Sequence, residues 1–139
     1  MITKEHILSA QESWGNGIVA LGKEKVDASD FLNEHYLDGA LVKPTIASEN
    51  VFRLNSENLR SYFVGGCCEE DAGFALKPWS SVRFENAGFI LGETQASAMG
   101  HYFFTHNGEE TKVEYSFGYT LVEGVLKINL HHSSLPYSA

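Results

Sequence analysis

The sequence predicts an α+β fold in which N-terminal helices pack in a curved antiparallel sheet. Two observations predict it. Early in the chain, apolar residues recur at spacings of three and four, as they do along one face of a helix. From Phe74 onward the period changes to two, which is typical of strands. Three helical segments followed by a long meander suggest a cone, with the helices on its concave side and an open mouth.

Caps and stops mark the first and third helical segments. Thr3 is a suitable N-cap for the first. The apolar stripe of this helix consists of Trp14, Ile18 and Leu21. The third begins at Ser56, carries Tyr62 on its inner face and is closed by Gly65-Gly66. Both helices therefore offer one face to a sheet.

The second helical segment is shorter and leads into an extended one. It is expected to begin near Ser29 or Asp30 and to stop at Gly39. Its apolar and aromatic members are Phe31, Leu32, His35 and Tyr36. Leu41 to Thr45 should be extended, because Pro44 cannot continue a helix and favours β geometry in the residue before it.

The second half of the chain predicts four strands joined by tight turns. They lie at about 82 to 91, 95 to 106, 109 to 121 and 125 to 134. Asn107-Gly108 is a strong type I′ hairpin signal, and Glu123-Gly124 is a weaker one. The last three strands should therefore be sequential antiparallel neighbours.

Two-residue turns at both places would fix which side chains face the concave side. The predicted rows are Gly100 with Tyr115 and His132, Tyr102 with Val113 and Ser134, and Ala98 with Phe117 and Leu130. His132 and Ser134 then face the pocket, where Gly100 would leave room beside them. A shift of one residue in the last turn would instead place His131 and Ser133 there.

Composition excludes several classes of function. The formal net charge is −8 and the ten Lys and Arg residues are scattered, so there is no basic surface for nucleic acid or an anionic membrane. No apolar run approaches a membrane span and the N-terminus is not signal-like, which makes a cytoplasmic location the default. Cys67 and Cys68 should be free thiols. Residues 1–139 are interpreted as one domain.

Few residues are candidates for chemistry. His132 and Ser134 could hold a water or a small anion between an imidazole and a hydroxyl, or could simply satisfy each other at a strand end. Thr45 and Tyr62 offer further hydroxyls near the mouth. A metal alternative would use three side chains on the outer sheet face, namely His101, Glu114 and His131. No nucleotide-binding or common hydrolase motif is present.

The cone layout resembles the nuclear-transport-factor-2-like (NTF2-like, SnoaL-like) fold, and the C-terminal half resembles one of its families closely. Its His131-His132-Ser133-Ser134-Leu135-Pro136 run is similar to the end of the iota-class carbonic anhydrases, which are grouped with the association domain of calcium/calmodulin-dependent kinase II. Further similar pieces are Lys43-Pro44-Thr45, Pro78-Trp79, Ala98-Met99-Gly100, Tyr102-Phe103-Phe104-Thr105 and Phe117-Gly118-Tyr119.

This resemblance implies reversible hydration of CO2 to bicarbonate in a pocket formed by Thr45, Tyr62, His132 and Ser134. Further substrate contacts are expected from Tyr115 and Gly100, which lie beside His132 in the predicted rows, and from Phe104 as part of an apolar wall. Leu130 replaces the first of three histidines found in many relatives, which favours a metal-free site, although zinc or manganese stays open. Members commonly form homodimers through their sheets. The alternatives are a non-catalytic association module and a small-molecule-binding protein.

Overall fold

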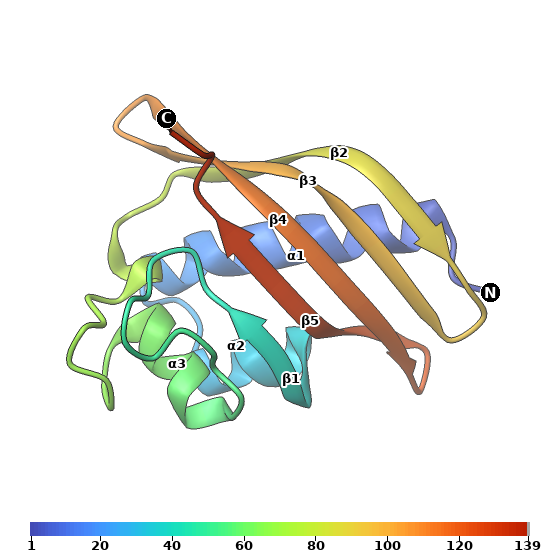
Figure 1. Cartoon of the computed structure of the whole chain (residues 1–139), viewed down its shortest axis with the longest axis horizontal. Coiled ribbons are helices and arrows are strands. Elements are labelled where there is room, and N and C mark those ends of the chain that lie inside the picture. Colours follow the sequence, from blue (N-terminus) through green and yellow to red (C-terminus); the bar gives the residue numbers. More distant parts are fainter. Residues whose placement is uncertain (139) are drawn as a thin grey trace.

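The computed structural model describes residues 1–138, and the α+β class is confirmed. Within these residues the order is α1 (Lys4–Gly22), α2 (Ala28–His35), β1 (Tyr36–Lys43), α3 (Ser56–Val64), a short 3-10 turn η1 (Phe74–Leu76), β2 (Ser81–Leu91), β3 (Gln95–His106), β4 (Glu109–Val122) and β5 (Val125–Ser134). The five strands form one sheet in the order β1-β5-β4-β3-β2. Figure 1 shows α1 crossing one face of this sheet, while α2 and α3 lie near β1.

The first and third helices form where the sequence predicts them. Thr3 caps α1, because its hydroxyl accepts from the backbone N–H of His6 and His6 Nδ1 accepts from the backbone N–H of Thr3. The cap of α3 is Asn55 rather than the predicted Ser56, which is the first residue of the helix. α1 lays its apolar stripe, including Trp14, on the concave face of the sheet.

The second helix is shorter than predicted. Asp27 caps α2 by accepting from two backbone N–H groups, and the helix ends at His35. Tyr36, expected on the helix, is the first residue of β1 and pairs in parallel with Ile128 of β5. Gly39 does not stop the helix but lies within β1 with a φ of 83°. Pairing with β5 thus overrides the local helical pattern.

The predicted turns and the predicted pairing of β3 with β4 are present in the structure. Asn107 and Gly108 have φ values of 50° and 79°, as a type I′ turn requires, and Glu123 and Gly124 have 50° and 82°. β3 and β4 pair as expected, with Gly100 opposite Tyr115. The other predicted β3–β4 pairs, Tyr102 with Val113 and Ala98 with Phe117, are also present.

The predicted rows of β5 are wrong, because the strand contains a bulge. Gly118 pairs with Leu130 while Tyr119 pairs with Ile128, so Asn129 is an extra residue on β5. Ile128 and His131 both face the interior although they are three residues apart. The side chain of Asn129 donates to Thr120 Oγ1 at 2.6 Å and occupies the space that a Cβ on Gly118 would need.

The bulge reverses the two faces of the end of β5. His131 and Ser133 are 4% and 1% exposed on the concave side, whereas His132 is exposed on the outer side. Ser134, predicted inside, lies on the outer side too, and Leu130 is 44% exposed. The prediction that His132 and Ser134 face the pocket is therefore corrected by one residue.

Trp14 is the centre of the core. Its ring stacks on Tyr102 with centroids 5.6 Å apart, and it meets the edges of Phe117 at 5.7 Å and His131 at 5.8 Å. The concave side of the sheet is thus a packed aromatic layer that contains one imidazole.

Candidate functional site

A chain of buried polar side chains runs through the aromatic core. Tyr36 OH lies 2.9 Å from Nδ1 of His131, and Tyr102 OH lies 3.0 Å from its Nε2. Tyr102 OH donates to Ser133 Oγ at 2.6 Å, and Ser133 Oγ is 2.6 Å from Thr45 Oγ1. Strands β1, β3 and β5 and the segment after β1 thus form one connected chain, in which two tyrosine hydroxyls bond the imidazole.

A small cavity of about 10 Å³ lies beside this chain. Thr45, Tyr62, Tyr102, His131 and Ser133 line it. Its apolar wall consists of Trp14, Val42, Pro44, Leu59, Phe63, Phe74 and Phe104. The volume is the space that one water molecule needs, and the polar lining offers that water several hydrogen-bond partners.

A second, larger cavity of about 440 Å³ adjoins the first. Thr45, Phe74 and Phe104 line both cavities, so they form the wall between them. The rest of the larger lining is mostly apolar and includes Ile46, Leu76, Trp79, Val113 and Leu135, with Lys77 as its cation. We call this larger cavity the vestibule.

Burial keeps the polar chain uncharged. Burial is also the main cause that lowers the pKa of His131 to about 3, with a smaller contribution from neighbouring His132, so the imidazole is neutral at physiological pH. Burial raises the pKa of Tyr36 and of Tyr102, which keeps both phenols protonated. Burial also raises the pKa of Tyr62. The backbone N–H of Ile46, which donates to the Tyr62 hydroxyl at 3.3 Å, lowers this pKa by a smaller amount. The cavity thus offers neutral donors and acceptors.

A buried ion pair holds the segment that carries Thr45. Arg53 is fully buried and donates two bonds to Asp71, at 2.7 and 2.8 Å. Ser61 Oγ donates to the same carboxylate at 2.6 Å, which ties α3 to it. Arg53 also pairs through its backbone with Val42 of β1. The segment after β1 is therefore fixed at its far end.

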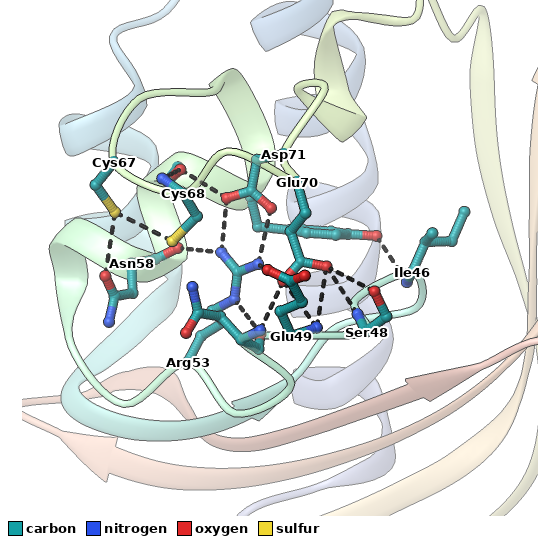
Figure 2. Close-up of polar contacts among 12 residues, drawn as sticks. Ile46, Ser48, Glu49, Arg53, Asn58, Cys67, Cys68, Glu70 and Asp71 are labelled. Atoms are coloured by element: carbon teal, nitrogen blue, oxygen red, sulfur yellow. Dashed lines mark hydrogen bonds and ion pairs between the residues drawn. The ribbon is translucent and has the colours of Figure 1, made fainter.

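Glu70 fastens the middle of the same segment. Figure 2 shows its carboxylate facing the backbone after Ile46. It accepts from the backbone N–H groups of Ser48, Glu49 and Asn50 at 2.6 to 3.3 Å. These bonds lower the pKa of Glu70, so the carboxylate stays ionised. Thr45 is thus held against the end of β5 by contacts outside the cavity.

The structure brings together only part of the predicted site. Thr45, Tyr62 and Phe104 line the small cavity. His132 and Ser134 instead line a groove of about 310 Å³ on the outer face of the sheet. The position predicted for them is taken by His131 and Ser133, the alternative that a shift of one residue allows.

Tyr115 and Gly100 do not line the small cavity or the vestibule. The Tyr115 hydroxyl accepts from Gln11 Nε2 at 2.7 Å and donates to the side chain of Asn86. The space on the concave side of Gly100 is not free, because a Cβ there would collide with the backbone of residues 85–87, where β2 bulges. The predicted room beside Gly100 is therefore absent.

The sequence prediction missed Tyr36 and Tyr102 as members of the site. Tyr102 lies in a predicted inward row, and a buried tyrosine hydroxyl usually has a hydrogen-bond partner, which could have indicated its place in the site. Tyr36 carried no such signal, because the pattern assigned it to a helix.

The predicted metal alternative does not assemble. His101 Nε2 and Glu114 Oε2 are 3.9 Å apart on the outer face, but His131 lies on the opposite side of the sheet. Among residues 1–138, no group of three histidine, cysteine, aspartate or glutamate side chains is placed to hold one ion. In the same residues no helix is long and apolar enough to cross a membrane.

Comparisons with known proteins agree on one family. Residues 5–135 match the family model of metal-independent carbonic anhydrases. A metal-independent carbonic anhydrase from Nostoc sp. is 36% identical over 154 residues, which cover 98% of this chain and 75% of that protein. The crystal structure of a cyanobacterial iota-carbonic anhydrase complexed with bicarbonate is 31% identical with a TM-score of 0.93, covering 99% of this chain and 94% of that one.

More distant structures share the fold. A putative calcium/calmodulin-dependent protein kinase II association domain from Xanthomonas campestris has a TM-score of 0.74 at 21% identity, covering 100% of this chain and 91% of that one. An NTF2-like protein from Shewanella oneidensis has a TM-score of 0.65 at 11% identity, covering 96% and 99%. These two confirm the NTF2-like fold that the sequence predicts.

Proposed function

We propose that this chain, which belongs to the metal-independent carbonic anhydrase family, hydrates CO2 in the small cavity between Thr45, Tyr62, Tyr102, His131 and Ser133. Its activity is the reversible hydration of CO2 to bicarbonate, without a metal cofactor. The cavity is favoured by one observation: hydroxyls and a neutral imidazole surround space for one water, next to an apolar vestibule.

The two cavities suit the two reactants. Hydroxyls of fixed position would orient one water in the small cavity. This lowers the entropy cost of bringing that water to CO2 in the right geometry. CO2 is apolar overall and would reach the shared wall of Thr45, Phe74 and Phe104 through the vestibule.

The reaction requires the water oxygen to bond to carbon while one carbon–oxygen π bond opens to an oxyanion. Hydroxyl donors aimed at that oxygen stabilise the developing charge in a site screened from bulk water. The proton released by the attacking water passes to water in the vestibule. His131 is a poor acceptor for it, because its pKa is lowered to about 3.

Matched pairs of neighbours on β5 test the site. We expect His131→Gln and Ser133→Ala to lower the CO2 hydration rate of chelator-treated protein in stopped flow by roughly a hundredfold, the scale of losing an oriented donor. His132→Gln and Ser134→Ala, whose side chains lie on the outer face, should stay within about twofold of wild type. Circular dichroism would verify that all four variants fold.

Two outcomes would contradict the proposal. A chelated wild type with no rate above buffer would refute metal-free hydration by this chain. Equal losses of CO2 hydration rate in the inward variant and its outward neighbour, for both the histidine and the serine pair, would refute the cavity as the site.

We also propose that the chain is a cytoplasmic homodimer joined through the outer face of its sheet. The outer face supports the dimer, because the apolar Met99 and Leu130 are 56% and 44% exposed beside the groove that contains His132.

The proposed cytoplasmic location is supported by the neighbouring Cys67 and Cys68, which carry free thiols and suit a reducing compartment. Cell fractionation that recovers the chain outside the cytoplasm would refute the location.

A further inference from the structure

The polar chain begins at Trp14, whose indole N–H can only donate a hydrogen bond. It donates to Tyr36 OH at 3.1 Å. The second partner of this hydroxyl is His131 Nδ1, at 2.9 Å. Since Trp14 offers no lone pair, the hydrogen of Tyr36 can be used only toward His131.

This arrangement fixes the tautomer of His131. Nδ1 accepts from Tyr36, so in a neutral imidazole the ring proton is on Nε2. Nε2–H then donates to Tyr102 OH at 3.0 Å, and Tyr102 in turn donates to Ser133 Oγ at 2.6 Å. The opposite tautomer would leave the buried hydrogen of Tyr36 without an acceptor, which is costly.

The direction of the chain decides what reaches the cavity. Ser133 and Thr45 each have one hydroxyl hydrogen, and one of these joins the two oxygens at 2.6 Å. Because Tyr102 supplies the hydrogen for its own bond to Ser133, the other hydrogen of the pair is left for the cavity. In a reversed chain Ser133 would donate to Tyr102, and the pair would offer the cavity only lone pairs.

We propose that Trp14 and Tyr36 are positioning residues that act through His131, and that they orient the hydroxyl chain so that it presents a donor to the oxygen of CO2 that becomes the bicarbonate oxyanion. The inference rests on the proposed function for its purpose. The orientation itself rests on the contacts alone. A donor, rather than a lone pair, is what a developing negative charge requires.

The core makes this orientation stable. Trp14 is 2% exposed and Tyr102 is 1% exposed, so bulk water does not compete for their hydrogen bonds. The lowered pKa of His131 agrees with an imidazole that stays neutral across the physiological range.

Nitrogen NMR of histidine-labelled protein tests the tautomer without any activity measurement. The protonated and bare nitrogens of a neutral imidazole resonate far apart, and the His131→Gln variant would assign the signal. We expect wild type at pH 7 to show a protonated Nε2 and a bare Nδ1. A protonated Nδ1, or an imidazolium, would overturn the inference.

Tyr36→Phe tests the purpose, with Tyr119→Phe as its control. Tyr119 is a buried tyrosine of β4 that does not belong to the hydrogen-bonded row of polar side chains. We expect Tyr36→Phe to move the two nitrogen signals of His131 toward each other and to lower kcat for CO2 hydration roughly tenfold, with KM little changed. Tyr119→Phe should change neither.

The outcomes separate the two proposals. Unchanged kcat in a folded Tyr36→Phe whose tautomer has changed would overturn the positioning role. A wild type without hydration activity would refute the proposed function. The His131 tautomer of that protein would still test the proposed direction of the hydrogen bonds. If Tyr36→Phe does not fold, Tyr102→Phe interrupts the same chain on the other side of His131, and a fixed Nε2 proton in that variant is expected because Trp14 and Tyr36 remain.

Discussion

His131 is surrounded by groups that carry no charge. Tyr36 from β1 and Tyr102 from β3 bond its two nitrogens, and both phenols have raised pKa values. Phe117 from β4 packs against it at 4.4 Å between ring centroids, and Trp14 covers it from α1. None of these four groups is a carboxylate that would stabilise the charged form, so burial dominates the lowered pKa of His131.

This burial predicts a stability that depends on pH. Between the ordinary histidine pKa of 6.5 and the folded pKa of about 3, the unfolded chain binds a proton that His131 in the folded chain does not. The free energy of unfolding should therefore fall as pH drops from 6.5, by up to about 1.4 kcal/mol per pH unit from this group. Urea unfolding at pH 7, 6 and 5 would measure it.

The comparison with His131→Gln isolates that contribution. Other groups with shifted pKa values, such as His35 and Asp71, remain in both proteins. The variant should lose less stability on acidification than wild type. Parallel curves for wild type and His131→Gln would disprove a buried neutral imidazole.

At the scale of elements, β5 determines which residues reach the site. Its alternating Leu126, Ile128 and Leu130 predict an unbroken strand with Leu130 inside. The strand instead bulges at Asn129, opposite Gly118, and exchanges the faces of everything after it. A glycine opposite an asparagine is the only trace of the bulge in the sequence.

Most of the remaining elements could be predicted from local patterns. The cap of α1, the span of α3, the alternation of β2 to β4 and the Asn107-Gly108 turn are all encoded by near neighbours. Tyr36 could not be assigned, because its strand depends on pairing with β5, more than 90 residues away. Thr45 and Tyr62 could be placed near the mouth, but Ser133, the partner of Thr45 on β5, faces it only because of the bulge.

Gly118→Ala is expected to disturb the bulge and the site together. Its Cβ would collide with the side chain of Asn129 and press on Leu130 at 3.1 Å. We expect a loss of about 1 to 3 kcal/mol in the free energy of unfolding. The CO2 hydration rate should fall as well, because His131 and Ser133 follow the bulge directly.

Gly88→Ala is the matched control for urea unfolding and stopped flow. A Cβ at Gly88 meets nothing within 4 Å, although it too lies beside a bulge. We expect it to change stability by less than about 1 kcal/mol relative to wild type. Full stability and activity in Gly118→Ala would show that the register of β5 does not depend on this glycine.

At the scale of the whole molecule, the sheet separates two surfaces of different character. The concave side holds the aromatic core and the polar chain, while the outer side exposes Met99, His132 and Leu130. α1, α2 and α3 leave this outer side uncovered (Figure 1). A second copy of the chain would bury it and leave both cavities accessible.

A charge on the outer face should therefore separate the proposed dimer. We expect sedimentation velocity to show a dimer for wild type and mostly monomer for Met99→Glu, because burying an unpaired carboxylate in an interface is costly. Leu8→Glu places the same charge at a residue that is 40% exposed on α1, which covers the opposite face of the sheet. It should remain dimeric, and a monomeric wild type would refute the arrangement.

The size of the small cavity has a consequence for turnover. About 10 Å³ suits one water, whereas CO2 has three heavy atoms and bicarbonate has four. Bicarbonate fits there only while the surrounding rings stand apart, and of the two rings in the wall to the vestibule Phe74 is half-buried whereas Phe104 is buried. While the cavity is swollen, its lining loses dispersion contacts that are regained when it contracts. The resting shape of the core therefore works against retention of bicarbonate, and the recoil of the aromatic wall favours its release.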